Sequence, residues 1–171
     1  MSTAVLSLGS NLGERLRYLR LACDGLGDAL VGVSSVYETE PWGVTDQPDF
    51  LNAVCLVQHA ARDHWDWLRT AQALERRAER VREQRWGPRT LDVDVVMVDG
   101  VQSDDPELLL PHPGTAGRST VLIPWLEVDP QAWLPGYGWV EQLVGELDQQ
   151  DRAGVRRRPE LSLLTPGRGG E

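Results

Sequence analysis

The chain has 171 residues, of which 41% are hydrophobic, and this length predicts one domain built around one core. Its formal net charge of -9 argues against a nucleic-acid partner, because phosphate backbones attract clustered positive charge. No segment approaches the roughly 20 consecutive apolar residues that a membrane span requires, so we expect a cytoplasmic protein that contacts no membrane.

The basic residues and the cysteines exclude further kinds of site. All 17 basic residues are arginines, which excludes a Schiff-base lysine and the lysine of a phosphate-binding loop. Any phosphate group bound here would therefore be neutralised by arginine and metal ions. The two cysteines, Cys23 and Cys55, are widely separated and form no metal-binding motif, so we predict two small buried side chains.

The first predicted elements are a strand, a turn and a helix. Residues 4–8 form an apolar run, and apolar side chains recur at helical spacing over residues 12–26. Asn11 and Glu14 fit a capping box, which favours a helix start here over a phosphate-binding loop. Gly25 and Gly27 then predict the end of this helix.

Two predicted strands enclose a long loop. Residues 31–39 alternate in the manner of a half-buried strand, and residues 50–58 form the next strand. Between them, residues 40–49 contain two prolines, a glycine and a tryptophan, which predicts a surface loop that forms a lid or a pocket wall. Phe50 and Asn52 point to the same face of their strand, so an aromatic ring and an amide stand side by side.

The remaining elements complete an α+β domain. A strand is predicted over residues 90–98. Helices are predicted over residues 63–82, where apolar side chains form one stripe, and over residues 115–128 and 139–147. This order favours a mixed or antiparallel sheet covered by helices over a doubly wound parallel sheet. We therefore predict one domain over residues 1–149 and a loosely attached, flexible tail over residues 150–171.

The most specific motif is the run Arg-Trp-Gly-Pro-Arg-Thr-Leu-Asp-Val-Asp at residues 85–94. On a strand, Asp92 and Asp94 project from the same face about 7 Å apart. Two carboxylates this close repel each other unless a divalent cation lies beside them, and hard oxygen ligands suit magnesium. The neighbouring arginines are suited to grip phosphate oxygens, so phosphoryl transfer is one interpretation. A surface network of arginine–aspartate ion pairs is the other, and the aspartate pair alone does not decide between them.

This run resembles the signature of the 6-hydroxymethyl-7,8-dihydropterin pyrophosphokinase family. Further segments match in that family's order and approximate spacing, at residues 8–12, 35–39, 47–53 and 111–112. The resemblance implies a ferredoxin-like α+β sandwich that works as a monomer in folate biosynthesis. It also implies a reaction in which the hydroxymethyl oxygen of a reduced pterin attacks the β-phosphorus of ATP and releases AMP.

The resemblance further implies a role for each matching residue. Two magnesium ions would be held by Asp92 and Asp94, and the transfer would also depend on Arg80, Arg82 and Arg89. Contacts with ATP would come from Gln72, Glu75, Arg85, Trp86, Arg89, His112 and Arg118. Contacts with the pterin would come from Thr39, Trp42, Gly43, Phe50, Asn52 and Asp92.

Two positions depart from the family pattern, and two other functions stay open. Thr120 stands where a second ring-stacking aromatic residue is expected, and Glu107 stands where some members carry a basic residue. One alternative is a nucleotidyltransferase, which also pairs aspartates with two metal ions. The other is a binding module without catalysis. Their products separate the three functions: AMP with a pterin diphosphate, diphosphate with a nucleotidylated acceptor, or no AMP.

Overall fold

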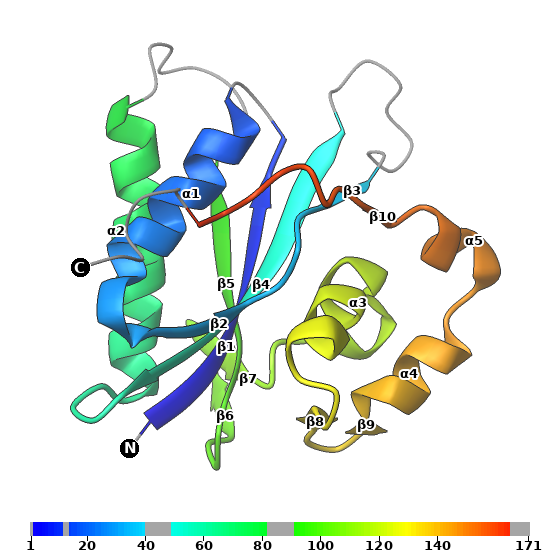
Figure 1. The fold of residues 1–171 in the computed structure, drawn as a ribbon. Coiled ribbons are helices and arrows are strands. Elements are labelled where there is room, and N and C mark those ends of the chain that lie inside the picture. Colours follow the sequence, from blue (N-terminus) through cyan, green and yellow to red (C-terminus); the bar gives the residue numbers. More distant parts are fainter. Residues whose placement is uncertain (1, 12–13, 40–48, 82–90, 165–171) are drawn as a thin grey trace.

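The computed structural model describes residues 2–11, 14–39, 49–81 and 91–164. Within these residues, the central sheet contains β1 (Ser2–Ser10), β2 (Leu30–Val33), β3 (Tyr37–Thr39), β4 (Phe50–His59), β5 (Asp92–Val98) and β10 (Arg156–Arg157). The strand order is β10-β3-β4-β1-β5, and β2 pairs with β4 (Figure 1). The pairings in this sheet are antiparallel, which confirms the predicted sheet type.

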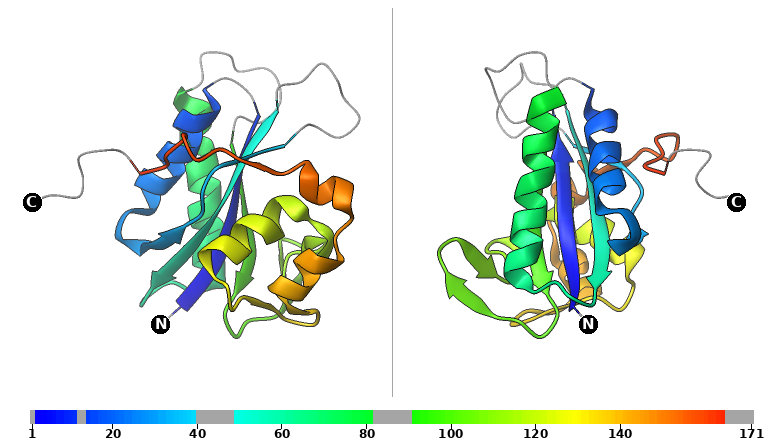
Figure 2. Two further views of the ribbon diagram at one scale, coloured as in Figure 1. Left: turned by 45° about the vertical axis from the view of Figure 1, so that its right-hand side comes forward. Right: turned by 90° about the vertical axis from the view of Figure 1, so that its left-hand side faces the viewer.

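Helices cover both faces of the sheet, as the two views in Figure 2 show. One face carries α1 (Arg15–Leu26) and α2 (His64–Val81), and the other carries α3 (Ser119–Val128) and α4 (Val140–Glu146). Two hairpins lie outside this sheet, formed by β6 (Ser103–Asp105) with β7 (Leu108–Leu110) and by β8 (Trp133–Leu134) with β9 (Gly138–Trp139). Among the described helices, none combines the length and the apolar composition needed to cross a membrane.

Alternation along β1 builds a separate core on each face of the sheet. Leu6 and Leu8 belong to the core under α1 and α2, whereas Val5 belongs to the core under α3 and α4. Trp67 of α2 is fully buried in the first core, and its indole N–H donates to the Ser2 hydroxyl at 2.8 Å. The predicted apolar stripe of this helix is thus the face that packs on the sheet.

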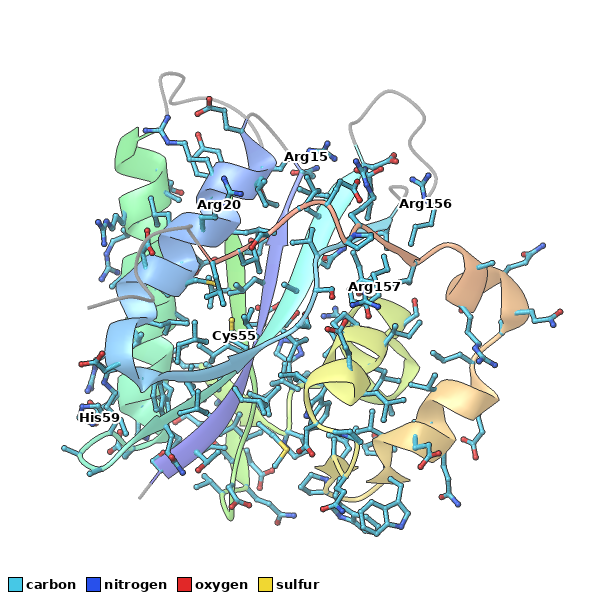
Figure 3. All side chains as sticks on the ribbon, viewed as in Figure 1. Arg15, Arg20, Cys55, His59, Arg156 and Arg157 are labelled. Atoms are coloured by element: carbon cyan, nitrogen blue, oxygen red, sulfur yellow. The ribbon has the colours of Figure 1, made fainter. Side chains whose placement is uncertain are left out.

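Both cysteines are buried free thiols, as predicted. Cys23 lies on α1 and Cys55 lies on β4, and Figure 3 places Cys55 inside the molecule. A hydrogen bond with Cys23, together with burial, raises the pKa of the Cys55 thiol. These two side chains therefore serve as packing groups of the first core.

The start of α1 differs from the predicted start. The helix begins at Arg15, its N-cap residue is Glu14, and no side chain caps it, so the predicted capping box at Asn11 is wrong. Asn11 is instead buried directly after β1. At the other end, Gly27 ends the helix as predicted, with a φ of 54°, which residues with a side chain rarely adopt. Gly25, also predicted as part of this stop, lies inside the helix.

The predicted strand over residues 31–39 is divided into β2 and β3. Ser34 lies between them and makes two bonds with Val54: its backbone N–H donates to the Val54 carbonyl, and its hydroxyl accepts from the Val54 N–H, both at 2.9 Å. The serine hydroxyl thus replaces a backbone acceptor where the chain leaves the ladder. As a result, β3 pairs separately with the first residues of β4.

Residues 150–164 are not the loosely attached tail that the sequence predicted. The chain forms α5 (Gln149–Ala153) and then β10, which extends the sheet by pairing with β3. The Arg158 N–H donates to the Val36 carbonyl at 2.8 Å, and Leu163 is buried in the first core. This attachment depends on ion pairs and backbone bonds to distant residues, which a polar local sequence does not reveal. Residues 165–171 lie outside the described part of the chain.

Replacing Trp67 with alanine should lower the free energy of unfolding by about 3–5 kcal/mol, because the change empties a fully buried site. Urea unfolding followed by circular dichroism measures the loss. The matched control is Trp133, whose side chain is exposed on β8, and Trp133→Ala should cost about 1 kcal/mol or less. Equal losses in the two variants would contradict the central position of Trp67.

Candidate active site

A row of three residues crosses the sheet over β4, β1 and β5. The register aligns Asn52 with Gly9, and Gly9 with Asp92. Residues directly opposite each other in antiparallel strands share a face, so the amide and the carboxylate stand on the same face with their backbones roughly 10 Å apart. We call Asn52, Gly9 and Asp92 the polar row. It lies on the face that packs against α3 and α4, since Val54, two residues after Asn52, belongs to that core.

Gly9 leaves an opening in the middle of the polar row. A Cβ atom added at this position would lie 3.4 Å from Oδ1 of Asn52, so the amide oxygen faces the space that a side chain would fill. The same amide donates through Nδ2 to the Thr39 hydroxyl at 2.9 Å. This bond orients the amide and directs its acceptor oxygen toward the sheet surface above Gly9.

A cavity of about 660 Å³ opens beside Asn52. Thr39 and Phe50 line it together with Asn52, so the structure brings together three of the predicted pterin contacts. The start of α3 contributes Arg118 and Thr120 to the same cavity. Further lining comes from the C-terminal part of the chain, through Gln150, Asp151, Gly154 and Val155.

Asp92 and Asp94 are half-buried on one face of β5, while Val93 between them is buried on the other. Glu75 of α2 accepts a hydrogen bond from the Val93 backbone N–H at 3.4 Å, which ties the helix to this strand. The two carboxylates are hard ligands that fit magnesium. Over the described ranges, no group of three or more His, Cys, Asp or Glu side chains is placed to hold a metal ion. Magnesium commonly keeps several waters and takes further ligands from substrate phosphates.

The other described residues predicted to contact ATP lie on α2 and in the segment before α3. Gln72 is exposed on α2, three residues before the half-buried Glu75. The His112 N–H donates to the Val96 carbonyl of β5 at 2.8 Å, and its ring Nδ1 pairs with the Pro113 carbonyl at 3.0 Å. Because a carbonyl oxygen only accepts, Nδ1 is the donor in this pairing.

Glu127 of α3 fixes this helix against the entry to β3. Its carboxylate accepts bonds from the Ser35 N–H at 2.8 Å, from the Ser35 hydroxyl at 3.0 Å and from the Tyr37 hydroxyl. Burial, followed by the bond to Glu127, raises the pKa of Tyr37 well above its usual value. Because β3 and the start of α3 both line the cavity, this contact holds two of its walls in place.

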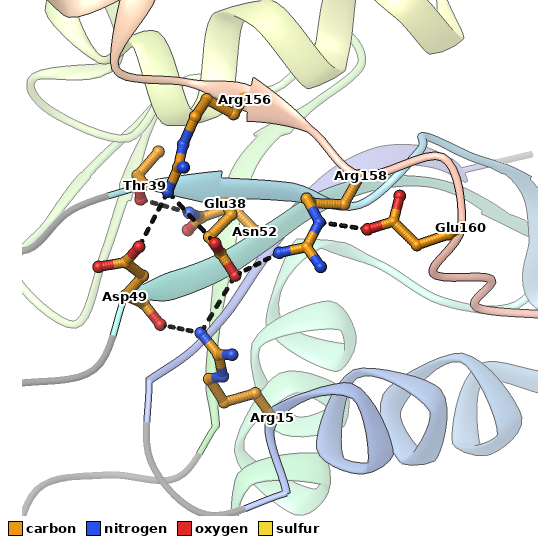
Figure 4. A network of polar contacts seen from close by, with 8 residues as sticks. All are labelled: Arg15, Glu38, Thr39, Asp49, Asn52, Arg156, Arg158 and Glu160. Carbon is orange, nitrogen blue, oxygen red and sulfur yellow. Dashed lines mark hydrogen bonds and ion pairs between the residues drawn. The ribbon is translucent and has the colours of Figure 1, made fainter.

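An ion-pair cluster surrounds the buried carboxylate of Glu38 on β3 (Figure 4). Arg158 lies 2.9 Å, Arg156 3.2 Å and Arg15 3.5 Å from its oxygens. Arg156 also pairs with Asp49 at 2.9 Å. We call these five residues the Glu38 cluster. In Figure 3, Arg15 and Arg156 lie at the end of the molecule opposite His59.

Several predicted site residues fall outside the described part of the chain. They are Trp42, Gly43, Arg82, Arg85, Trp86 and Arg89. Arg80 belongs to α2, but its side chain also lies outside the described part. The proposed lid over residues 40–49 and most of the arginine-rich run therefore stay predictions.

Two parts of this site are not predicted from the sequence. Gly9 belongs to the turn predicted after residues 4–8, whereas in the structure it lies in β1, which ends at Ser10, and stands opposite Asn52. Val155 was assigned to a flexible tail, and no local pattern marks it as a cavity residue. Glu107, one of the departures from the family pattern, is exposed in the turn between β6 and β7.

Residues 5–130 match the model of the 7,8-dihydro-6-hydroxymethylpterin-pyrophosphokinase (HPPK) family. A 2-amino-4-hydroxy-6-hydroxymethyldihydropteridine pyrophosphokinase of Mycobacterium tuberculosis (strain ATCC 25618 / H37Rv) is 47% identical, over 95% of this chain and 94% of its own length. The proteins of the same name from Mycobacterium leprae and Methylorubrum extorquens are 48% and 37% identical, over 91% and 92% of this chain and 88% and 99% of theirs.

Solved structures support the fold. A Plasmodium falciparum HPPK-DHPS variant with pterin and p-hydrobenzoate aligns with a TM-score of 0.66 at 12% identity, over 91% of this chain and 47% of that chain. An HPPK-DHPS in complex with substrates aligns with a TM-score of 0.63 at 11% identity, over 84% and 43%. The chain thus spans about half the length of these structures, and the ferredoxin-like α+β expectation is confirmed. Because the family model covers most of the chain and near-full-length relatives share the same name, the chain belongs to the 7,8-dihydro-6-hydroxymethylpterin-pyrophosphokinase family.

Proposed function

We propose that the chain transfers the terminal diphosphate of ATP to the hydroxymethyl group of 6-hydroxymethyl-7,8-dihydropterin and releases AMP, as a step of folate biosynthesis. Membership of the family supports this reaction. The observation that carries the assignment is the polar row, in which Asn52 and Asp92 stand on either side of Gly9. Asp94 follows on the same face of β5, so a ring-binding amide and a carboxylate pair share one surface.

The cavity beside the polar row suits a flat heteroaromatic ring. A pterin carries N–H donors and a carbonyl acceptor along one edge, and the oriented Asn52 amide offers groups that complement this edge. Phe50 supplies aromatic surface in the same cavity. The open position at Gly9 leaves room for the ring to approach the sheet. We therefore assign the pterin to this cavity, with its reactive end toward Asp92.

Asp92 and Asp94 are proposed to hold two magnesium ions together with the phosphates of ATP. The half-buried carboxylates on one face of β5 support this role, because like charges so close together favour a divalent cation between or beside them. When bound, magnesium neutralises phosphate charge and stabilises the charge that develops during transfer. The arginines of residues 80–89, with Arg118 and His112, are the proposed partners of the phosphates.

The transfer forms a bond between the hydroxymethyl oxygen and the β-phosphorus of ATP. It breaks the bond from that phosphorus to the oxygen that bridges to the α-phosphorus, and AMP leaves with this oxygen. The hydroxyl proton is released in the same reaction. Asn52 and Phe50 hold the ring in place, so catalysis rests on positioning and charge neutralisation rather than on a covalent intermediate with the chain.

A monomer in the cytoplasm is part of this proposal. Thr39, Phe50 and Asn52, three of the described side chains assigned to the pterin, line one cavity of one chain, which supports a single chain as the catalytic unit. The use of ATP as the diphosphate donor supports a cytoplasmic location.

The assay that tests the function combines the purified chain with ATP, magnesium chloride and the dihydropterin, and measures nucleotides and pterins by chromatography. The expected result is AMP and pterin diphosphate in equal amounts, with no product after chelation of magnesium. Release of diphosphate with a nucleotidylated acceptor would identify a nucleotidyltransferase instead. Pterin binding without AMP would identify a binding module.

Asp92→Asn and Asp94→Asn should each lower kcat for AMP formation by about 100-fold or more, because an amide of the same shape replaces a magnesium ligand. Initial rates at several magnesium concentrations measure this effect. Asp99→Asn is the matched control, since Asp99 is an exposed aspartate directly after the same strand, and its rate should stay close to that of the unmodified chain. Near-normal turnover in either variant would remove the metal role.

Gly9→Ala should raise KM for the pterin at least about tenfold and leave KM for ATP nearly unchanged. The new methyl group would lie 3.4 Å from Oδ1 of Asn52 and would occupy the surface assigned to the ring. Steady-state kinetics with each substrate varied in turn separates the two constants. The control is Gly145→Ala in α4, where no atom lies within 4 Å of the added carbon. An unchanged pterin KM in Gly9→Ala would place the ring elsewhere.

A further inference from the structure

We propose that the C-terminal strap, defined as residues 149–158, forms a second wall of the pterin cavity and supplies Val155 as an apolar contact for the ring. The inference rests on the proposed function, because it assigns an additional specificity-determining residue to the same site. The strap contains α5 and β10. The match to the family model ends at residue 130, so this wall comes from a part of the chain that the match does not reach.

The side chains that line the cavity indicate that Val155 is the second apolar contact for the ring. Among the described residues that line it, Phe50 and Val155 carry the two large apolar side chains, while the others are polar or are glycines. A flat ring has two faces, and both gain from contact with apolar atoms when they leave water. Phe50 belongs to β4 and Val155 to the strap, so they approach the cavity from separate parts of the chain.

The residue at position 120 offers little apolar surface to the second face of the ring. Thr120 at the start of α3 lines the cavity with a short, hydroxyl-bearing side chain. Its neighbours in the lining, Gly117 and Ser119, are also small. This side of the cavity therefore offers little apolar surface, and Val155 is half-buried where such surface is needed.

The Glu38 cluster fixes the strap to the sheet next to the cavity. Glu38 is followed directly by Thr39, which lines the cavity and bonds to Asn52. Arg156 is the residue after Val155, and it pairs with Glu38 at 3.2 Å and with Asp49 at 2.9 Å. The Glu38 side chain is only 10% exposed, so these ion pairs lie partly out of water and are screened less than surface pairs.

Other contacts hold the strap and the residues that follow it. Arg156 and Arg157 of β10 align with Glu38 and Tyr37 of β3 in antiparallel register. Beyond the strap, Leu163 is buried in the first core, and the guanidinium of Arg20 donates to the Ser162 carbonyl at 2.7 Å. Val155 is therefore held between α5 and a paired strand.

The strap should affect the pterin and not the nucleotide. Its lining residues share the cavity with Thr39, Phe50 and Asn52, which are predicted pterin contacts, and with Arg118, which is a predicted ATP contact. Because Val155 is apolar, its contact is with the ring and not with the charged phosphates. Removing apolar atoms from the Val155 side chain would therefore raise Kd and KM for the pterin, whereas kcat at saturating pterin and KM for ATP would stay the same. A purely structural defect would instead lower the melting temperature and the amount of active enzyme without this selectivity.

The first experiment compares Val155→Ala and Val155→Thr with the unmodified full-length chain. Pterin binding is measured by isothermal titration calorimetry in the presence of magnesium and a non-hydrolysable ATP analogue, and kinetics are measured with each substrate varied in turn. We expect Val155→Ala to weaken pterin binding roughly three- to tenfold, since it removes apolar contact area. Val155→Thr keeps the shape of the side chain and should also weaken binding. The control is Val31→Ala, because Val31 is 58% exposed on β2, and its binding should not change.

The second experiment tests the anchor, with Arg156 as a positioning residue. Arg156→Ala removes the pairs to Glu38 and Asp49 and should raise Kd and KM for the pterin while kcat is retained. Arg156→Lys keeps a charge near Glu38 and should recover part of the affinity. Arg152→Ala is the control, since Arg152 is an exposed arginine of α5 on the same strap.

The outcomes distinguish a failure of the strap assignment from a failure of the proposed reaction. If the unmodified chain forms AMP and binds the pterin, but both Val155 variants bind it as tightly as Val31→Ala does, the strap assignment is overturned. If the unmodified chain binds the pterin without forming AMP, the proposed reaction fails. The strap assignment is then supported by weaker binding in the Val155 variants and overturned by unchanged binding. An equal loss of affinity for pterin and ATP analogue would also overturn it, because the strap would then act on the whole fold.

Discussion

The register of β1 between β4 and β5 is the constraint on which the rest of the site depends. It places Gly9 between Asn52 and Asp92, so that two functional side chains face each other across a position without a side chain. A shift by one residue on either side would turn one of these groups to the opposite face, which packs against α1 and α2. The apolar residues of β1 that alternate with Gly9, such as Leu8 and Leu6, oppose such a shift because they fill the first core.

The two faces of the sheet differ near the polar row. The face under α1 and α2 carries the apolar side chains of the first core, and Trp67 anchors one of these helices. The other face is covered by α3 and α4 around Val54, but two residues earlier in β4 it presents Asn52. A single strand thus passes from a packed core to a polar surface within one alternation period.

Sequence patterns predicted the parts of the fold that depend on local periodicity. The apolar stripe of α2, the face shared by Phe50 and Asn52, and the aspartates on one face of β5 follow from spacing alone. The start of α1 was wrong because Asn11 satisfied a capping pattern while the packing of β1 buried it. The strap was missed for a different reason. Its attachment depends on a carboxylate far away in the sequence, and no local pattern contains that information.

The strap also has a consequence for the order in which the molecule folds. Its contacts with Glu38 and Asp49 join residues that are 107 to 120 positions apart, whereas a helix forms from neighbours. Closing so long a loop is entropically costly, and contacts of this kind form late in folding. The wall of the cavity that the strap forms therefore cannot be in place until residues 149–158 have been synthesised.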